Sequence, residues 1–311
     1  MGGHAPRVAV VVVTYNSAPV IGGCLDSLRE QGVDLVSVVV ADNASADASV
    51  AVAGAATRLP LRVVQTGRNA GYAAALNAGI ATLDLRKLDA VFVANPDCRL
   101  RPGTLARLAA ALREPGRAIA VPRLVNPDGS VQPTLRRMPA LHRAVAEAVL
   151  GGRLAGRLGS LGELVTDPRR HEVPGPAAWA TGAALLVCAE AVRDLGPWDE
   201  SFLLYSEETE FMLRAADRGW TVWYEPAAVV EHIGGQQRSN PDLAALSVAN
   251  KVRLYRRRHA VPAWCAYYLA TLLGEALRAL AGRRISAAAC AVLLRPSRRE
   301  LIIQAITGGD R

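Results

Sequence analysis

The chain has 311 residues, which is enough for one large globular domain or two smaller ones. Hydrophobic residues make up 51% and charged residues 21%, which excludes a disordered chain. The five cysteines are scattered without a CxxC pair, so they indicate buried free thiols and neither a disulfide framework nor a zinc site. No apolar run is long enough for a membrane span or a signal peptide. We therefore expect a cytoplasmic protein.

The net charge of +8 is concentrated toward the C-terminus. Residues 251–311 contain 12 basic and 3 acidic residues, whereas the preceding 250 residues contain 24 basic and 25 acidic ones. A basic segment favours an anionic partner, either a nucleic acid or a membrane surface. The sequence carries no helix-turn-helix, RNA-binding aromatic signature or zinc finger. A nucleic-acid-binding protein is therefore only a minor alternative.

The first 122 residues alternate β-branched runs with helical patterns. Strands are predicted over 8–13, 36–41, 61–65, 90–94 and 118–121, and helices over 20–31, 72–83 and 104–112. Apolar strands separated by helices are typical of a mostly parallel sheet with helices on both faces. We therefore predict an α/β, Rossmann-like fold.

The remainder of the chain is less regular. Residues 124–176 are rich in Gly, Pro and Arg and predict irregular structure, followed by an apolar segment over 182–191. A helix is predicted over 207–219, a strand from Thr221, and further helices over 247–258 and 262–281. We expect one unit over 1–240, with halves that meet at about residue 122, and a basic amphipathic helical extension over 241–311.

Polar residues follow the predicted strands at their carboxyl ends, where parallel sheets bind ligands. Asp42 could accept a hydrogen bond from the imide N–H of a pyrimidine base or from ribose hydroxyls, or it could form an ordinary Asx turn. Asp97 could hold Mg²⁺ or Mn²⁺ on a diphosphate, or it could cap a turn. The segment from Gly67 to Tyr72 places glycines before a helix but matches neither nucleotide fingerprint.

Carboxylates also gather at the predicted helix start near residue 207. Glu207 and Glu208 stand among apolar residues, which raise the pKa of a carboxylate and suit it to act as a general base. Acidic residues are also ordinary at a helix N-terminus. His232 follows a strand-like segment and is either structural or a ligand.

The order of these segments resembles the family 2 inverting glycosyltransferases with the GT-A fold, and most closely their bacterial rhamnosyltransferase-type branch. The resemblance covers about Val8 to His259 and rests on VVVVTYN, VADNAS, GRNAGYAAALNAGI, VANPDC, WDESFLLYSEETEFMLRAADRGW and EPAAVVEH. It implies inverting transfer from a nucleoside-diphosphate sugar, for which we favour dTDP-L-rhamnose. The acceptor would be a hydroxyl of a lipid-linked or polysaccharide substrate in cell-envelope biosynthesis. A soluble natural-product acceptor is the alternative.

The resemblance also implies roles for individual residues. Asp42 would bind the base with help from Thr14 and Tyr15, Asp97 would hold Mg²⁺ or Mn²⁺ with His232 as a further ligand, and Glu208 would be the catalytic base. The remaining candidates for substrate binding are Asn16, Asn69, Gly71, Asn95, Trp179 and Gly182.

Two positions depart from the family pattern. Asn95-Pro96-Asp97 replaces the frequent Asp-x-Asp, and Glu207-Glu208 replaces a Glu-Asp pair, so Glu207 competes with Glu208 for the role of base.

The basic extension has two interpretations. Lys251–Arg258 precedes an apolar stretch over 262–281 that contains Trp264 and Tyr268. This pattern predicts an interfacial helix at the inner face of the cell membrane, next to a polyprenyl-diphosphate-linked acceptor. The alternative is an ordinary packed helix hairpin with a solvated Arg face. The sequence leaves a homodimer open.

Overall fold

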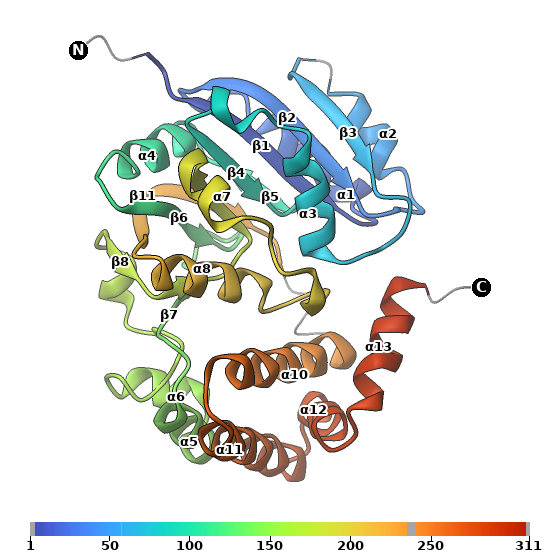
Figure 1. The fold of residues 1–311 in the computed structure, drawn as a ribbon, viewed down its shortest axis with the longest axis vertical. Coiled ribbons are helices and arrows are strands. Elements are labelled where there is room, and N and C mark those ends of the chain that lie inside the picture. The colour runs from blue at the N-terminus through green and yellow to red at the C-terminus, as the bar shows by residue number, and fades with distance from the viewer. Residues whose placement is uncertain (1–3, 57, 235–239, 309–311) are drawn as a thin grey trace.

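The computed structural model describes residues 4–56, 58–234 and 240–308. A twisted sheet with helices on both faces occupies one end of the molecule, and a layer of helices occupies the other (Figure 1). The first part of the chain contains β1 (Arg7–Thr14), α1 (Ala18–Asp26), β2 (Asp34–Asp42), α2 (Ser49–Gly54), β3 (Leu61–Gln65), α3 (Tyr72–Ala81), β4 (Ala90–Ala94), β5 (Cys98–Leu100), α4 (Thr104–Ala111) and β6 (Arg117–Val125).

The second part completes the sheet and adds helices. It contains β7 (Leu135–Arg136), α5 (Leu141–Leu150), α6 (Gly152–Arg157), β8 (Gly175–Ala177), β9 (Trp179–Ala180), β10 (Ala184–Cys188), α7 (Ala189–Leu195), α8 (Glu207–Asp217) and β11 (Thr221–His232). The C-terminal helices are α10 (Pro241–Arg258), α11 (Val261–Leu280), α12 (Arg284–Leu294) and α13 (Ser297–Thr307). Short 3-10 helices span Leu85–Lys87, Pro168–His171 and Glu200–Phe202.

The main sheet has the strand order β3-β2-β1-β4-β10-β6-β11-β5, with β8 paired to β11. The pairs β3–β2, β2–β1, β1–β4 and β6–β11 are parallel, whereas β10 is antiparallel to both of its neighbours. The chain reaches β10, which lies between β4 and β6, through a long connection that contains α5 and α6. The predicted α/β fold with a mostly parallel sheet and a C-terminal helical extension is confirmed.

Alternate side chains of the valine-rich strands fill two cores. Val11 and Val39 pack with α3 and α8 on one face, and Val10 and Val38 pack with α1 and α4 on the other. This period of two explains why β1 is apolar from Val8 to Val13, since both of its faces are buried there. The five cysteines are free thiols, as predicted, but only Cys24 and Cys98 are buried, whereas Cys188, Cys265 and Cys290 are partly exposed.

Two expectations about secondary structure were wrong. Residues 124–176 are not irregular throughout, because they contain α5 and α6. The apolar positions of α5 pack against α11 of the distant C-terminal region, a partner that composition cannot indicate. The helix expected over 20–31 ends at Asp26, and turns follow it.

The C-terminal helices are fastened to the rest of the molecule by ion pairs. Arg257 pairs with Asp199 at 2.5 Å, and Arg258 pairs with Asp217 at 2.7 Å. Part of the positive charge that suggested an anionic partner is therefore neutralised within the molecule. Over the described residues, no helix combines the length and the apolar character needed to cross a bilayer.

Candidate active site

Thr14 and Asp42 end adjacent strands and lie opposite one another in the register of β1 and β2. Their side chains are buried, and Thr14 Oγ1 and Asp42 Oδ1 have no hydrogen-bond partner. The other carboxylate oxygen of Asp42 accepts a hydrogen bond from the backbone N–H of Ser45 at 3.1 Å. Buried oxygens without donors are costly, so this strand edge is suited to a ligand that brings its own N–H or O–H groups.

A cavity of about 370 Å³ opens beside this edge, and we call it the β1 cavity. Tyr15, Asn16, Asn69 and Gly71 line it, together with Ile306 of α13. Asn16 Oδ1 accepts from the backbone N–H of Ala46 at 2.8 Å, which fastens the loop after β2. The lining contains neither Thr14 nor Asp42, although it contains their chain neighbours Val13, Tyr15 and Asn43.

Asn43 organises the loop that carries Asn69, a role that the sequence did not reveal. Its Nδ2 donates to Asn69 Oδ1 at 2.7 Å, and its Oδ1 accepts from the backbone N–H of Ala70 at 3.0 Å. Asn69 Nδ2 in turn donates to the carbonyl of Ile306 at 3.1 Å. The strand-like context of Asn43, directly after Asp42, was the available signal.

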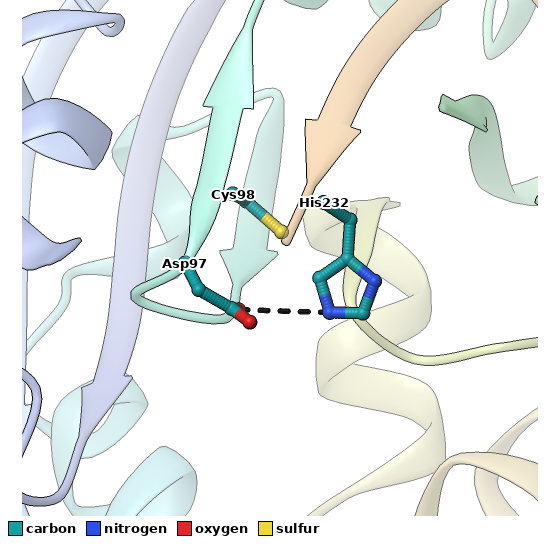
Figure 2. Close-up of side chains that lie close together, drawn as sticks. All are labelled: Asp97, Cys98 and His232. Carbon is teal, nitrogen blue, oxygen red and sulfur yellow. Dashed lines mark ion pairs between the residues drawn. The ribbon is translucent and has the colours of Figure 1, made fainter. Parts of the chain in front are cut away.

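Asp97 and His232 point toward one another from two segments that are adjacent in space, and Cys98 lies beside them (Figure 2). Asp97 Oδ1 lies 3.6 Å from His232 Nε2 and has no hydrogen-bond partner. The other oxygen, Oδ2, accepts from the backbone N–H of Gly234 at 2.9 Å. Asp97 follows β4 and His232 ends β11, so the sheet brings together two residues that are far apart in the chain.

The protonation state of His232 makes this pair a good cation site. Its Nδ1 lies 3.0 Å from Gln132 Oε1, which can only accept, so the proton sits on Nδ1 and Nε2 presents a lone pair. Burial lowers the pKa of His232, although the charge of Asp97 opposes that shift. A carboxylate oxygen and an imidazole lone pair that face each other suit a divalent cation between them.

Cys98 lies close enough to Asp97 and His232 to be a metal ligand, but its thiol is poorly suited to bind a cation. Its thiol is within the same group of candidate ligand atoms, but its Sγ donates to the carbonyl of Ala183 at 3.2 Å. Burial raises the pKa of the Cys98 thiol well above its usual range, so the thiol keeps its proton. The donors that fit a metal are therefore Asp97 and His232.

A second cavity, of about 430 Å³, adjoins the first, and we call it the α8 cavity. Glu207, Glu208, Trp179 and Gly182 line it. The side chains that line both cavities are Tyr72, Asn95, Asp97 and Leu204. Asp97 therefore stands at the junction of the two cavities, and both glutamates share the α8 cavity with it.

The glutamates have raised pKa values because they are buried at the start of α8. Burial raises the pKa of Glu207, and the charge of Glu208 raises it further. Burial also raises the pKa of Glu208, but backbone N–H groups of the first turn and the charge of Arg136 oppose that shift. The charged form of Glu208 is thus better stabilised than that of Glu207, and Glu207 keeps its proton to higher pH. Each has one Oε atom without a hydrogen-bond partner.

Gly182 and Gly71 let the chain close tightly around this cavity. A Cβ on Gly182 would lie 2.7 Å from the Cβ of Glu208. A Cβ on Gly71, where φ is +94°, would lie 2.3 Å from the carbonyl oxygen of Leu203. Both sites therefore require glycine.

The loop before Glu207 is strained. Leu203, Tyr205 and Ser206 all have positive φ angles, which are unfavourable for residues with side chains. Asn250 of α10 holds this loop, because its Nδ2 donates to the carbonyls of Phe202 and Leu204, each at 2.9 Å. Asn250 is fully buried. It fixes the backbone just before Glu207 and lines neither of the two cavities.

Three further residues of the α8 cavity were missed from the sequence. Tyr72 begins α3, and its buried hydroxyl has no hydrogen-bond partner. Arg136 stands near Glu208, in a segment that was expected to be irregular. Lys251 was counted in the basic extension, yet it lines this cavity and pairs with Glu163 at 2.8 Å. No local pattern marks these positions, because each contacts a distant part of the chain.

The predicted site residues thus fall into three groups. Those that line the β1 cavity are Tyr15, Asn16, Asn69 and Gly71, together with the shared Asn95 and Asp97. Those that line the α8 cavity are Trp179, Gly182, Glu207, Glu208 and His232. Thr14 and Asp42 are buried and line neither cavity.

Comparison with known proteins reveals the relationships of the chain. The family model described as "Glycosyl transferase family 2" matches residues 9–161. The N-acetylglucosaminyl-diphospho-decaprenol L-rhamnosyltransferase of Mycobacterium tuberculosis (strain ATCC 25618 / H37Rv) is 36% identical over 233 residues, which are 72% of this chain and 75% of that protein.

Solved structures agree at the level of the fold. The mannosyltransferase PcManGT from Pyrobaculum calidifontis, in complex with GDP-Man and Mn²⁺, superimposes with a TM-score of 0.58 at 20% identity and covers 98% of this chain and 87% of that one. Glucosyl-3-phosphoglycerate synthase from Mycobacterium tuberculosis, with Mn²⁺ and UDP, gives a TM-score of 0.52 at 18% identity over 81% of this chain and 80% of that one.

Proposed function

Because the chain belongs to glycosyl transferase family 2 and is a nucleotide-sugar glycosyltransferase with the GT-A fold, we propose that it transfers L-rhamnose from dTDP-L-rhamnose with inversion. The acceptor is a hydroxyl of a polyprenyl-diphosphate-linked sugar in cell-envelope biosynthesis. The observation that carries this choice is the 36% identity over 233 residues with a rhamnosyltransferase whose named acceptor is N-acetylglucosaminyl-diphospho-decaprenol.

The β1 cavity and the strand edge beside it support binding of the nucleotide. We propose that Asp42 accepts the imide N–H of the thymine base and that Thr14 accepts or donates nearby, because each keeps an oxygen without a partner. Tyr15 is 44% exposed beside the cavity and supplies a flat surface for the base. Asn16, Asn69, Gly71 and Asn95 line the path of the ribose and the diphosphate.

Asp97 and His232 would hold Mg²⁺ or Mn²⁺ at the junction of the two cavities. When bound, the cation neutralises the negative charge of the leaving diphosphate. Asp97 is prepared for this role by the backbone N–H of Gly234, which fixes one carboxylate oxygen and leaves the other directed toward His232. Gln132 fixes the imidazole so that its Nε2 lone pair faces the same point.

Glu208 takes the proton from the acceptor hydroxyl as that oxygen attacks the anomeric carbon. Its charge is favoured by Arg136 and by backbone N–H groups, whereas Glu207 is more deeply buried. Trp179 and Gly182 shape the wall against which the acceptor sugar lies. Burial of the glutamate pair raises the pKa of the base toward neutrality, where a general base is most effective.

We further propose that residues 1–240 form the catalytic unit and that residues 241–311 bring it to the inner face of the cell membrane. Leu269, Leu273, Leu277 and Leu280 of α11 are 60%, 52%, 47% and 87% exposed and follow one another at helical spacing. An apolar helix face of this kind, next to the remaining basic residues, fits peripheral contact with an anionic bilayer.

The decisive experiment compares donors and acceptors with the full chain and Mn²⁺. Transfer is measured from dTDP-L-rhamnose, UDP-GlcNAc and GDP-mannose to a short-chain prenyl-diphospho-N-acetylglucosamine. We expect product only with dTDP-L-rhamnose. Transfer to soluble aglycones in place of the prenyl-diphosphate substrate would favour the alternative acceptor class.

A further inference from the structure

A groove of about 750 Å³ lies beside the α8 cavity and is unusually rich in arginine. The arginines that line it are Arg136, Arg137, Arg143, Arg157 and Arg170, and the lining contains a single carboxylate, that of Asp167. Asp167 Oδ1 accepts from the backbone N–H of Arg169 at 3.0 Å. We call this surface the arginine groove.

Four arginines of the groove, all except Arg136, form no ion pair within the described residues. Arg137 donates to the carbonyl of Gly162 at 2.8 Å, and Arg143 donates to that of Ser160 at 3.0 Å. Backbone carbonyls orient the guanidinium groups of Arg137 and Arg143 but leave their charge available.

Two further observations fit the binding of an anion in the groove. Burial lowers the pKa of Arg137, and the positive charges of Arg143 and Arg170 lower it further. Thr166 also lines the groove, and its Oγ1 is buried without a hydrogen-bond partner. An anion with several oxygens would relieve the repulsion between the cations and accept a hydrogen bond from the hydroxyl of Thr166.

The groove lies between the active site and an apolar surface. Arg136 lines both the arginine groove and the α8 cavity, and its guanidinium lies 5.5 Å from the ring centre of Trp179. On the other side, Arg143 belongs to α5 and Arg157 to α6. The exposed apolar side chains of these two helices are Val145, Val149, Leu150 and Leu154. Both helices lie with α11 at the end of the molecule opposite the sheet (Figure 1).

We propose that the arginine groove binds the diphosphate of the lipid-linked acceptor, while the lipid chain leaves over α5 and α6. This inference rests on the proposed function. In such an acceptor the diphosphate joins the sugar to the lipid. The sugar would lie at the glutamates of the α8 cavity, the diphosphate in the arginine groove, and the lipid over the apolar side chains of α5 and α6. The donor diphosphate is already accounted for by Asp97 and His232, so the groove serves a second one. Guanidinium forks bind phosphate oxygens in pairs, which suits five arginines to this ligand.

The test reverses the charges of Arg157 and Arg170, whose side chains make no contact among the described residues that stabilises the fold. Arg157→Glu/Arg170→Glu changes exposed side chains for which no hydrogen bond or ion pair within the described residues exists, so the fold is retained. The matched control is Arg58→Glu/Arg113→Glu, which changes the net charge equally at exposed positions outside the groove. Steady-state transfer is measured with a water-soluble short-chain prenyl-diphospho-sugar and with an alkyl glycoside of the same sugar, which lacks the diphosphate.

We expect the groove variant to raise the KM for the diphosphate acceptor about tenfold or more. The KM for the nucleotide sugar, the rate of donor hydrolysis and the KM for the alkyl glycoside stay unchanged, as do all constants of the control variant. An unchanged KM for the diphosphate acceptor would overturn the inference while leaving the proposed function intact. Failure of the wild-type enzyme to use any prenyl-diphosphate acceptor would instead overturn the proposed function.

One more measurement separates the acceptor from bilayer headgroups. Binding of both variants to vesicles that contain phosphatidylglycerol is measured by sedimentation. We expect the KM for the soluble acceptor to rise in the groove variant whether or not its vesicle binding changes, because that acceptor presents its diphosphate without a bilayer. A loss confined to the groove variant, with an unchanged KM for the soluble acceptor, would identify the groove as a headgroup site and overturn the inference.

Discussion

The two carboxylate oxygens of Asp97 differ in their hydrogen bonding. One is fixed by the N–H of Gly234, and the other faces His232 without a hydrogen bond. Asn keeps the size of the side chain but removes the negative charge that a divalent cation requires. The substitution Asp97→Asn therefore isolates the electrostatic contribution of this residue from its packing.

We expect Asp97→Asn to reduce transfer about 10²-fold or more, because the charge of the leaving diphosphate is then poorly neutralised. Initial rates over a series of Mn²⁺ concentrations provide the measurement, and the activity should not recover at high Mn²⁺. Asp128→Asn, in an exposed turn, is the control and should behave like the wild type. Wild-type rates in Asp97→Asn would rule out this metal site.

The glutamate pair gives a prediction about pH. Burial raises both pKa values, and a base works only when it has lost its proton, so kcat should increase with pH through the raised pKa of the pair. Glu208→Gln should lower kcat about 10²- to 10⁴-fold at every pH. Glu207→Gln should keep the increase with its midpoint little changed, because Glu207 holds its proton while Glu208 ionises and is already neutral in the wild type.

The pH–rate profiles of the two variants distinguish the roles directly. Titration calorimetry with the nucleotide should give wild-type affinity for both, which excludes a loss of folding as the cause. If Glu207→Gln abolished turnover while Glu208→Gln retained it, the two assignments would be exchanged.

At the scale of elements, the loop from Leu203 to Ser206 depends on a helix far along the chain. Asn250 satisfies two carbonyls of this segment, and its Oδ1 accepts from Arg299 Nε of α13 at 3.1 Å. Three positive φ angles in the loop are tolerated only because such contacts fix the backbone. Helices α10 and α13 therefore hold the start of α8, where Glu207 and Glu208 lie.

We expect Asn250→Ala to lower kcat about tenfold and to leave the KM for the donor within about twofold, because the β1 cavity does not contact Asn250. The control is Asn240→Ala, which removes the N-cap of the same helix and costs about 1 kcal/mol of stability without touching the loop. Kinetics and urea unfolding of both variants provide the measurement. Equal kcat values in the two variants would reduce Asn250 to a stabilising role.

At the scale of the whole molecule, the active site lies between the sheet and the layer of C-terminal helices. Lys251 and Leu254 line the α8 cavity, and Ile306 lines the β1 cavity. The C-terminal helices thus complete both cavities, in addition to presenting the exposed leucines of α11. Substrate binding and contact with a bilayer would in this way involve the same helical layer.

We expect Leu273→Gln/Leu277→Gln to reduce sedimentation with anionic vesicles several-fold, because apolar area that would enter the bilayer is lost. Transfer to a water-soluble acceptor should be unchanged, since these side chains face away from both cavities. The control Leu294→Gln/Leu301→Gln changes leucines of similar exposure on α12 and α13. An equal loss of vesicle binding in the control would argue against α11 as the contact surface.

Local patterns determined much of the fold. The valine runs and the helical spacing predicted β1 to β4 and α3 because both patterns depend only on nearby residues. The polar residues at strand ends were predicted for the same reason. The carboxyl ends of parallel strands meet at one edge of the sheet, so residues that follow those strands, such as Asp42 and Asp97, lie at that edge. The resemblance in segment order then connected them with Glu208 and His232.

Tertiary structure alone decided how these residues are held. The tautomer of His232 depends on Gln132, the loop before Glu207 depends on Asn250, and α5 depends on α11. The arginine groove likewise gathers side chains from β7, α5, α6 and the segment after Leu164. Periodicity and turn chemistry describe neighbours in the chain, whereas each of these contacts joins positions whose distance is set by packing of the whole sheet against the helical layer.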